Sequence, residues 1–151
     1  MTADTTRVST PRRRVVLTAV TEAALDVAAH AAACADAAAG ATVTFAGVVR
    51  DHDGGRRVQR LSYVGHPSAP AVLAQVAADV AARHPVDALA VSHRLGDLEV
   101  GDVALAVAVS AAHRGEAFTA AADLVDEVKA RLPVWKRQVL GDGTDEWVAC
   151  P

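Results

Sequence analysis

The stretch Asp102 to Ser110, which reads Asp-Val-Ala-Leu-Ala-Val-Ala-Val-Ser, determines the plan of the fold. Bulky valine and leucine residues alternate with alanines, and the side chains of a strand point alternately to the two faces of a sheet. Both faces are therefore apolar, one bulky and one small, as in a strand covered on both sides. We predict a strand that lies at the centre of a sheet or at a subunit contact.

Helices and strands alternate around this stretch. Apolar residues at helical spacing predict helices from Thr21 to Ala39 with Gly40 as the stop, from His66 to Arg83, and from about Glu116 to Leu132. Strands are predicted for residues 14–20, 41–50, 58–64, 86–93, 102–110, around Lys136 and for 146–148, with a polar loop at 51–57 and a turn at 93–98. This order predicts an α+β fold in two layers with a mostly antiparallel sheet.

Composition limits the classes of protein that this chain can belong to. The 151 residues are 52% hydrophobic, which suits one domain over residues 14–151 after a disordered N-terminal segment, residues 1–13. A net charge of −3 and an aromatic content of 3% argue against a nucleic-acid partner. No apolar run reaches the length of a membrane span, and Val15 to Val20 lacks the continuation of a signal peptide, so we expect a cytoplasmic protein without a membrane partner.

Metal and cofactor motifs are not found in the sequence. Cys34 and Cys150 stand far apart in no ligand spacing, and the adjacent residues Asp51, His52 and Asp53 cannot easily converge on one ion. Neither glycine-rich nucleotide motif occurs, and no G-x-S-x-G elbow supplies a serine nucleophile. We therefore expect no metal and no cofactor, and a turn at the Asp-Gly step.

Two lysines lie on either side of Pro133 in the stretch Val128 to Arg137. Proline disfavours the helical conformation of the preceding residue, so Lys129 should occupy a last helical turn and Lys136 a strand. Four cations within nine residues favour loss of a proton, and a lysine so placed can act as acid, base or nucleophile. The structural alternative is that these cations complement the helix dipole or are solvated surface.

His113 and Arg114 follow the central strand directly and begin the third predicted helix. Free amide groups at a helix N-terminus, together with an arginine side chain, form a site suited to a phosphate. The alternative is that His113 is a capping or core residue and Arg114 a surface charge.

Five segments in this order resemble the large, catalytic subunit of molybdopterin synthase, the MoaE family. They are Phe45-Ala-Gly-Val-Val-Arg50, His93-Arg-Leu-Gly-Asp-Leu98, Val109-Ser-Ala-Ala-His-Arg114 with Ala117-Phe118, Lys129-Ala-Arg-Leu-Pro-Val-Trp-Lys-Arg137 and Glu146-Trp-Val148. The resemblance covers roughly residues 42–148. It implies an α/β hammerhead-type fold and a homodimer that binds a small ubiquitin-like sulfur-carrier subunit, MoaD-like, at each end to form a heterotetramer.

The resemblance also implies a sulfurtransferase of molybdenum cofactor biosynthesis. The carrier ends in Gly-Gly, and its C-terminal thiocarboxylate delivers sulfur to cyclic pyranopterin monophosphate, which opens the cyclic phosphate and forms the dithiolene of molybdopterin. Lys129 would be the acid, base or covalent participant nearest the thiocarboxylate. Lys136 would assist it and hold the pterin, and no metal or ATP would be needed at this step.

The remaining site residues follow from the same resemblance. Arg50, His113 and Arg114 would bind the substrate phosphate and offset charge as the ring opens. Phe45 and Trp135 would form walls of the pocket.

The chain departs from the family pattern in two places. Val64 and His66 stand where members commonly carry Tyr-Glu and a second aromatic residue, and the arginine that some members place after the Trp-Val motif is missing. Either Arg56 or Arg57 would replace that arginine, or phosphate binding would be weaker. The competing hypothesis is a non-catalytic module on the same fold that binds a phosphate ligand or a carrier tail, and a third is an oligomeric scaffold.

Overall fold

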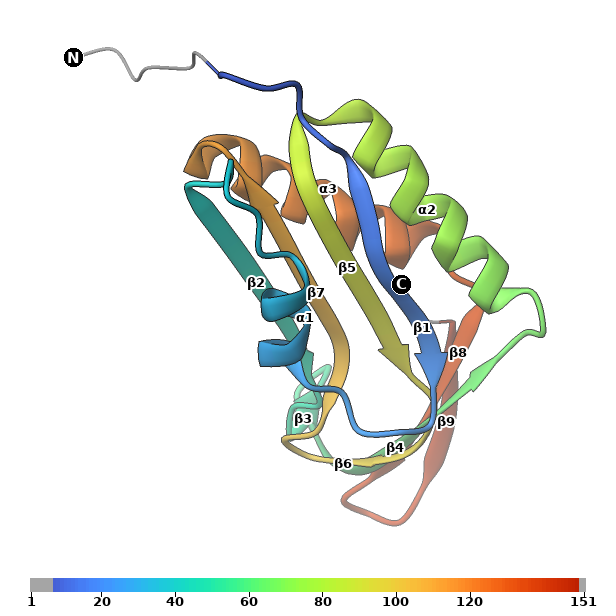
Figure 1. Cartoon of the computed structure of the whole chain (residues 1–151). Helices are drawn as coiled ribbons and strands as arrows, with labels where there is room; N and C mark the ends of the chain where they lie inside the picture. Colours follow the sequence, from blue (N-terminus) through green and yellow to red (C-terminus); the bar gives the residue numbers. More distant parts are fainter. Residues whose placement is uncertain (1–6, 150–151) are drawn as a thin grey trace.

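The computed structural model describes residues 7–149 as an α+β fold, as predicted (Figure 1). Its elements are β1 (Arg14–Thr21), α1 (Val27–Ala33), β2 (Ala41–Val48), β3 (His52–Asp53), β4 (Arg56–Gly65), α2 (Ala69–Arg83), β5 (Val86–Arg94), β6 (Gly96–Glu99), β7 (Val103–Ala111), α3 (Arg114–Arg131), β8 (Val134–Leu140) and β9 (Asp145–Ala149).

The first sheet has the strand order β1-β5-β7-β2, and β7 is one of its two inner strands. Val107 of β7 lies opposite Val91 of β5 on one side and Phe45 of β2 on the other. Of the strand pairs in residues 7–149, β1 with β5 is parallel and the others are antiparallel. The prediction of a central strand in a mostly antiparallel sheet is confirmed.

The two faces of the first sheet are covered unequally, as the alternation of bulky and small residues in β7 requires. Leu105, Val107 and Val109 belong to the large core, which α2 and α3 complete on one face. Ala108, on the opposite face, packs with Cys34 next to the short helix α1. Alanines leave room there for a close approach, so a seven-residue helix and the segment after it cover this face.

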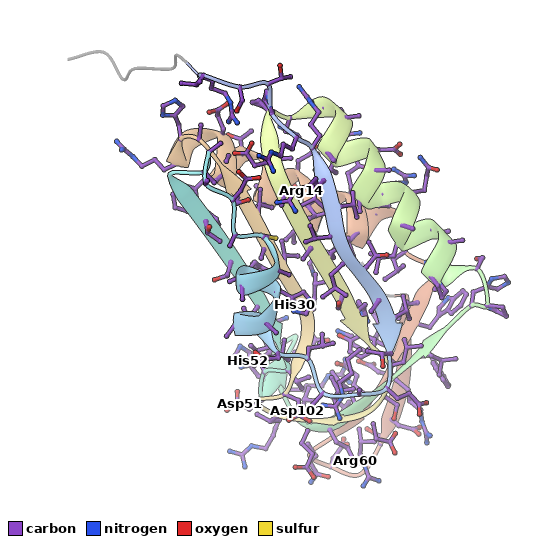
Figure 2. All side chains as sticks on the ribbon, in the orientation of Figure 1. Arg14, His30, Asp51, His52, Arg60 and Asp102 are labelled. Atoms are coloured by element: carbon purple, nitrogen blue, oxygen red, sulfur yellow. The ribbon has the colours of Figure 1, made fainter. Side chains whose placement is uncertain are left out.

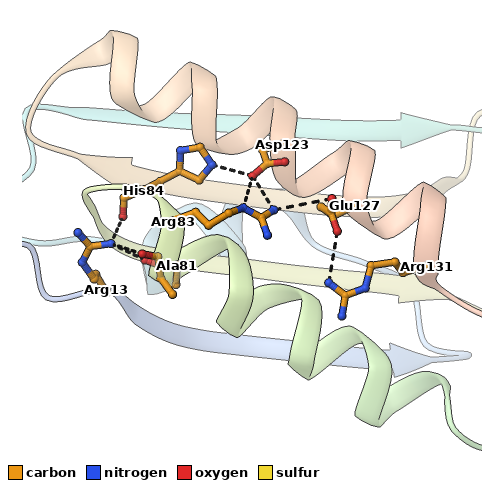
Figure 3. A network of polar contacts seen from close by, with 8 residues as sticks. Arg13, Ala81, Arg83, His84, Asp123, Glu127 and Arg131 are labelled. Carbon is orange, nitrogen blue, oxygen red and sulfur yellow. Dashed lines mark hydrogen bonds and ion pairs between the residues drawn. The ribbon is translucent and has the colours of Figure 1, made fainter.

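Helices α2 and α3 are also joined by ion pairs on their outer sides (Figure 3). Arg83 lies 2.8 Å and His84 2.7 Å from the same Asp123 carboxylate oxygen. About two turns further along α3, Arg131 pairs with Glu127 at 3.3 Å and with Asp79 of α2 at 2.9 Å. These contacts fix the position of the end of α3.

The second sheet has the order β3-β4-β8-β9, with β6 also paired to β4. It lies across the end of the first sheet at which β1 and β5 finish (Figure 1). The register sets Tyr63 of β4 opposite Lys136 of β8, and Leu61 opposite Gln138. The side chains of β8 therefore alternate between the gap that separates the two sheets and the outer surface.

Three predictions of local structure are wrong. Residues 51–57 are not a continuous loop, because residues 52–53 form β3 and pair with the first residues of β4. The first helix begins after Asp26, which accepts a hydrogen bond from the Ala29 amide at 3.1 Å, and ends at Ala33 instead of Ala39. The Asp36 carboxylate accepts the Ala38 amide at 2.9 Å and pairs with Arg14, which holds the next residues in turns. Residues 93–98 are largely strand, because residues 96–99 pair with the backbone of β4 and form β6.

The predicted N-terminal segment is described in part. Residues 1–6 lie outside the described residues, and residues 7–13 contain no helix or strand. Arg7 nevertheless pairs with the buried Asp87 at 2.6 Å, and the Arg13 amide donates to the Val86 carbonyl at 3.0 Å. Disorder of residues 1–13 in solution stays a prediction. None of the helices in residues 7–149 is both long and apolar enough to cross a membrane.

Candidate functional site

A pocket of about 270 Å³ lies between the two sheets, beside the C-terminal end of α3. Strands β2 and β7 of the first sheet, strands β4 and β8 of the second, and the last turn of α3 form its walls. The polar and aromatic side chains among its lining residues are Phe45, Arg50, His52, Asp53, Tyr63, His93, Lys129, Lys136 and Gln138.

Lys129 and Lys136 both line this pocket. Helix α3 ends because Leu132, which precedes Pro133, is extended (φ −69°, ψ 121°), so Lys129 occupies the last helical turn. Lys136 lies in the middle of β8 and faces the pocket with Gln138. The predicted secondary structure of both lysines is confirmed, and two elements bring the lysines together.

The cations of the pocket are not the four that the sequence places together. Arg131 pairs with Asp79 and Glu127, and Arg137 pairs with Asp145, all outside the pocket lining. Arg50, two residues after the end of β2, lines the pocket instead with Lys129 and Lys136. The positive charge that can meet an anion therefore comes from Arg50 and the two lysines.

Five of these polar and aromatic pocket residues were not predicted as site residues: His52, Asp53, Tyr63, His93 and Gln138. His93 is 5% exposed, its Nδ1 donates to the Arg94 carbonyl at 2.8 Å, and its ring packs edge-on against Tyr63 with centroids 4.8 Å apart. Burial lowers the pKa of His93, the Arg94 carbonyl partly opposes that change, and the charge of Lys129 lowers the pKa further. The structure thus places a neutral imidazole near Lys129. In the sequence, His93 shares a strand face with Leu89 and Val91, and this alternation was the signal that its side chain would be buried.

Phe45 and Trp135 were both predicted to form walls of the pocket; Phe45 lines it, whereas Trp135 does not. Trp135 precedes Lys136 in β8, so its side chain points to the opposite face of the second sheet and is 42% exposed. The alternation of a strand therefore separates two residues that are adjacent in sequence.

His113 and Arg114 also lie outside this pocket. They begin α3, whereas Lys129 ends it, and fifteen residues at 1.5 Å each separate Arg114 from Lys129 by roughly 22 Å. A single chain therefore does not bring its own His113 and Arg114 to its own lysines.

The two arginines considered as substitutes for a C-terminal arginine lie away from the pocket lining as well. Arg56 binds Glu146 at 2.8 Å, and the side chain of Arg57 packs over Gly141. Residues 150–151 of the tail lie outside the described residues. Among residues 7–149, no three His, Cys, Asp or Glu side chains are grouped closely enough to hold a metal ion.

The fold and the pocket together define a class of protein: a two-sheet α+β domain with a pocket between the sheets that two lysines and an arginine line. Comparison with known proteins specifies the family. The model of the family described as MoaE protein matches residues 20–131, and the chain belongs to this family.

Relatives and solved structures agree with this assignment. Proteins named molybdopterin synthase catalytic subunit are 42% identical over 120 residues in Oryza sativa subsp. indica and 43% identical over 110 residues in Pyrococcus abyssi. These alignments cover 79% and 72% of this chain, and 62% and 74% of the relatives. The structure of molybdopterin synthase from Staphylococcus aureus is similar with a TM-score of 0.80 and 26% identity, covering 86% of this chain and 95% of that one. The chain thus spans less than two thirds of the rice relative.

Proposed function

We propose that this chain is the catalytic subunit of a molybdopterin synthase. It would transfer sulfur from the C-terminal thiocarboxylate of a small, Gly-Gly-tailed carrier protein to cyclic pyranopterin monophosphate and so form the dithiolene. The observation that carries the proposal is the convergence of Lys129, Lys136 and Arg50 on one pocket in a chain of this family. The names of the relatives from rice and Pyrococcus abyssi support it.

The pocket suits a reaction in which two anions must approach each other. A thiocarboxylate and a phosphate repel one another, and the cations of Arg50 and Lys136 would offset that repulsion. Lys129 adjoins the apolar residues Val128 and Leu132 and the neutral His93, and would exchange protons with the reacting sulfur or the leaving phosphate oxygen. Phe45 would contact the pterin ring.

A second copy of the chain would supply His113 and Arg114. Beside the edge strand β2, a shallow apolar groove includes Val43, Phe45 and Phe118, and the Phe118 side chain is 61% exposed. A two-fold axis at this face, perpendicular to α3, would set the two α3 helices antiparallel. Each N-terminus would then approach the partner's Lys129 and add a second phosphate-binding group to the pocket that Arg50 already lines. The proposed assembly is a homodimer with one carrier at each end, a heterotetramer.

We place the activity in the cytoplasm as part of the same proposal. Cys34, the cysteine among the described residues, is a buried free thiol, which suits a reducing compartment.

The proposal is tested by sulfur transfer in vitro with the purified chain, a carrier thiocarboxylate and cyclic pyranopterin monophosphate. Wild type should form the dithiolene, and Lys129→Ala should lower its rate by at least about a hundredfold, as expected for loss of an acid–base group. Arg131→Ala is the matched control, because this cation is in the same helical turn but outside the pocket lining. Carrier binding without any product would instead favour the non-catalytic binding module.

Mixing two inactive variants tests the shared pocket. Lys129→Ala and Arg114→Ala should each be inactive as homodimers. A mixed dimer would contain one intact pocket, so random mixing should restore about a quarter of wild-type activity. No recovery, in mixtures shown to exchange subunits, would mean that Arg114 does not serve the pocket of a second copy.

A further inference from the structure

One carboxylate, that of Asp53, lies among the cations of the pocket, and the proposed reaction gives it no role so far. Asp53 lines the pocket, its Oδ2 accepts a hydrogen bond from Gln138 Nε2 at 2.7 Å, and its Oδ1 lies 3.3 Å from Arg50 Nη2. A negative charge disfavours anion binding unless it orders the cations around it. The role of Asp53 therefore depends on the two side chains that contact it, Gln138 and Arg50.

The backbone fixes the position of Asp53. Strands β3 and β4 form a tight hairpin in which Asp53 pairs with Arg56 across a two-residue turn. The turn residues Gly54 and Gly55 both have positive φ values, 57° and 78°, which is the conformation of a type I′ turn and favours glycine. The carboxylate thus projects from a short, rigid hairpin.

Gln138 fixes the carboxylate from the other side. Its side chain is almost fully buried, and its amide nitrogen donates to Asp53 and also, at 2.7 Å, to Glu146 of β9. Arg56 of β4 binds Glu146 at 2.8 and 3.0 Å. The hydrogen-bonded chain therefore runs through five residues in the order Arg56, Glu146, Gln138, Asp53 and Arg50. The Asp53 side chain cannot rotate without breaking its hydrogen bond from the buried amide of Gln138.

Asp53 is ionised at neutral pH, because its surroundings lower its pKa below the ordinary value of 3.8. The hydrogen bond from Gln138 lowers the pKa of Asp53 most, burial raises it, and the charges of Lys136 and Arg50 lower it further. His52 on β3 lies 2.8 Å from the Asp51 carboxylate, which is its neighbour in Figure 2. Asp53 is thus a fixed anion between two pocket cations.

We propose that Asp53 is a positioning residue, which holds the Arg50 guanidinium at the pocket in the orientation that binds the phosphate of the substrate. An exposed ion pair alone would do little, and the Arg50 side chain is 67% exposed. Because hairpin and amide already fix this carboxylate, Arg50 loses less side-chain freedom when the anion arrives. Immobilising such a side chain typically costs enough to change affinity about three- to tenfold. This inference rests on the proposed function for the identity of the anion.

Kinetics of the sulfur transfer distinguish positioning from a general structural role. Asp53→Asn should raise the KM for cyclic pyranopterin monophosphate roughly three- to tenfold, with kcat within about twofold and the KM for the carrier unchanged. In an Arg50→Ala background the same substitution should have no further effect, because its target is gone. Asp51→Asn is the matched control: it changes a neighbouring carboxylate that is 71% exposed and does not line the pocket, and should alter neither constant.

Two results would overturn the inference: an unchanged pterin KM in Asp53→Asn, or an effect of equal size in the Arg50→Ala background. Equilibrium binding of cyclic pyranopterin monophosphate keeps the test separate from turnover. If wild type forms no product but binds the pterin, and Asp53→Asn weakens that binding only when Arg50 is present, the proposed activity fails and the positioning role stands. If wild type neither forms product nor binds the pterin, both fail.

Discussion

Replacing Arg7 with alanine removes the partner of a fully buried carboxylate. The Asp87 side chain is 0% exposed, and both of its oxygens accept hydrogen bonds from Arg7, at 2.6 and 3.4 Å. Arg7 belongs to the segment before β1, yet its side chain is only 14% exposed. The substitution therefore leaves a charge inside the protein rather than on its surface.

The expected cost follows from that burial. Removing one partner of a buried ion pair typically costs about 3–5 kcal/mol, and the slight exposure of Arg7 places this pair at the lower end, near 3 kcal/mol. For a domain of this size the loss corresponds to a fall in Tm of roughly 6–12 °C. Arg12→Ala should cost less than about 0.5 kcal/mol, because Arg12 is 61% exposed and lies 3.8 Å from Asp36.

Urea unfolding at one fixed protein concentration measures both changes, since a dimer's stability depends on concentration. The double variant Arg7→Met with Asp87→Leu should recover most of the loss, because no charge is then left buried. A free energy of unfolding for Arg7→Ala within 0.5 kcal/mol of wild type would refute the reasoning. It would instead support disorder of residues 1–13 in solution.

Two further predictions concern stability. Gly40→Ala should lower the free energy of unfolding by about 1–3 kcal/mol, because the added Cβ would lie 2.6 Å from the Ala112 carbonyl oxygen. The control Gly115→Ala adds a Cβ that meets nothing within 4 Å and should leave the stability unchanged or raise it. Thermal unfolding measures both changes. Burial alone would raise the pKa of Asp123, but hydrogen bonds from His84 and Arg83 lower it below its ordinary 3.8. Its stabilising contribution is therefore complete above that pH and lost as pH falls through the lowered value, so the difference in free energy between wild type and Asp123→Asn should shrink in acid unfolding experiments.

The fold was predictable where local sequence determines it. Alternation identifies β7 as an inner strand, and Pro133 ends α3 so that Lys129 and Lys136 fall on different elements. The first helix was predicted too long, because alanine-rich sequence favours helix at every position. The contacts that end it, from Asp36 to Arg14 and to the Ala38 amide, partly depend on residues distant in sequence.

The site was predictable only in part, for the same reason. The lysines, Arg50 and Phe45 fall in segments with recognisable patterns. The pairing of Asp53 with Gln138 joins residues 85 positions apart, which no local pattern reports. His113 and Arg114 begin α3, and the length of that helix separates them from the pocket of their own chain.

The length of α3 also constrains how this chain can vary. One helix of 18 residues carries His113 and Arg114 at its start and Lys129 at its end. Inserting or deleting a single residue between them would shift one end by about 1.5 Å and rotate it by about 100°. In the proposed dimer, each pocket combines the start of one α3 helix with the end of the other, so such a change would misalign both pockets at once. We therefore expect functional homologues to tolerate length changes in the loop after β8 but none within α3.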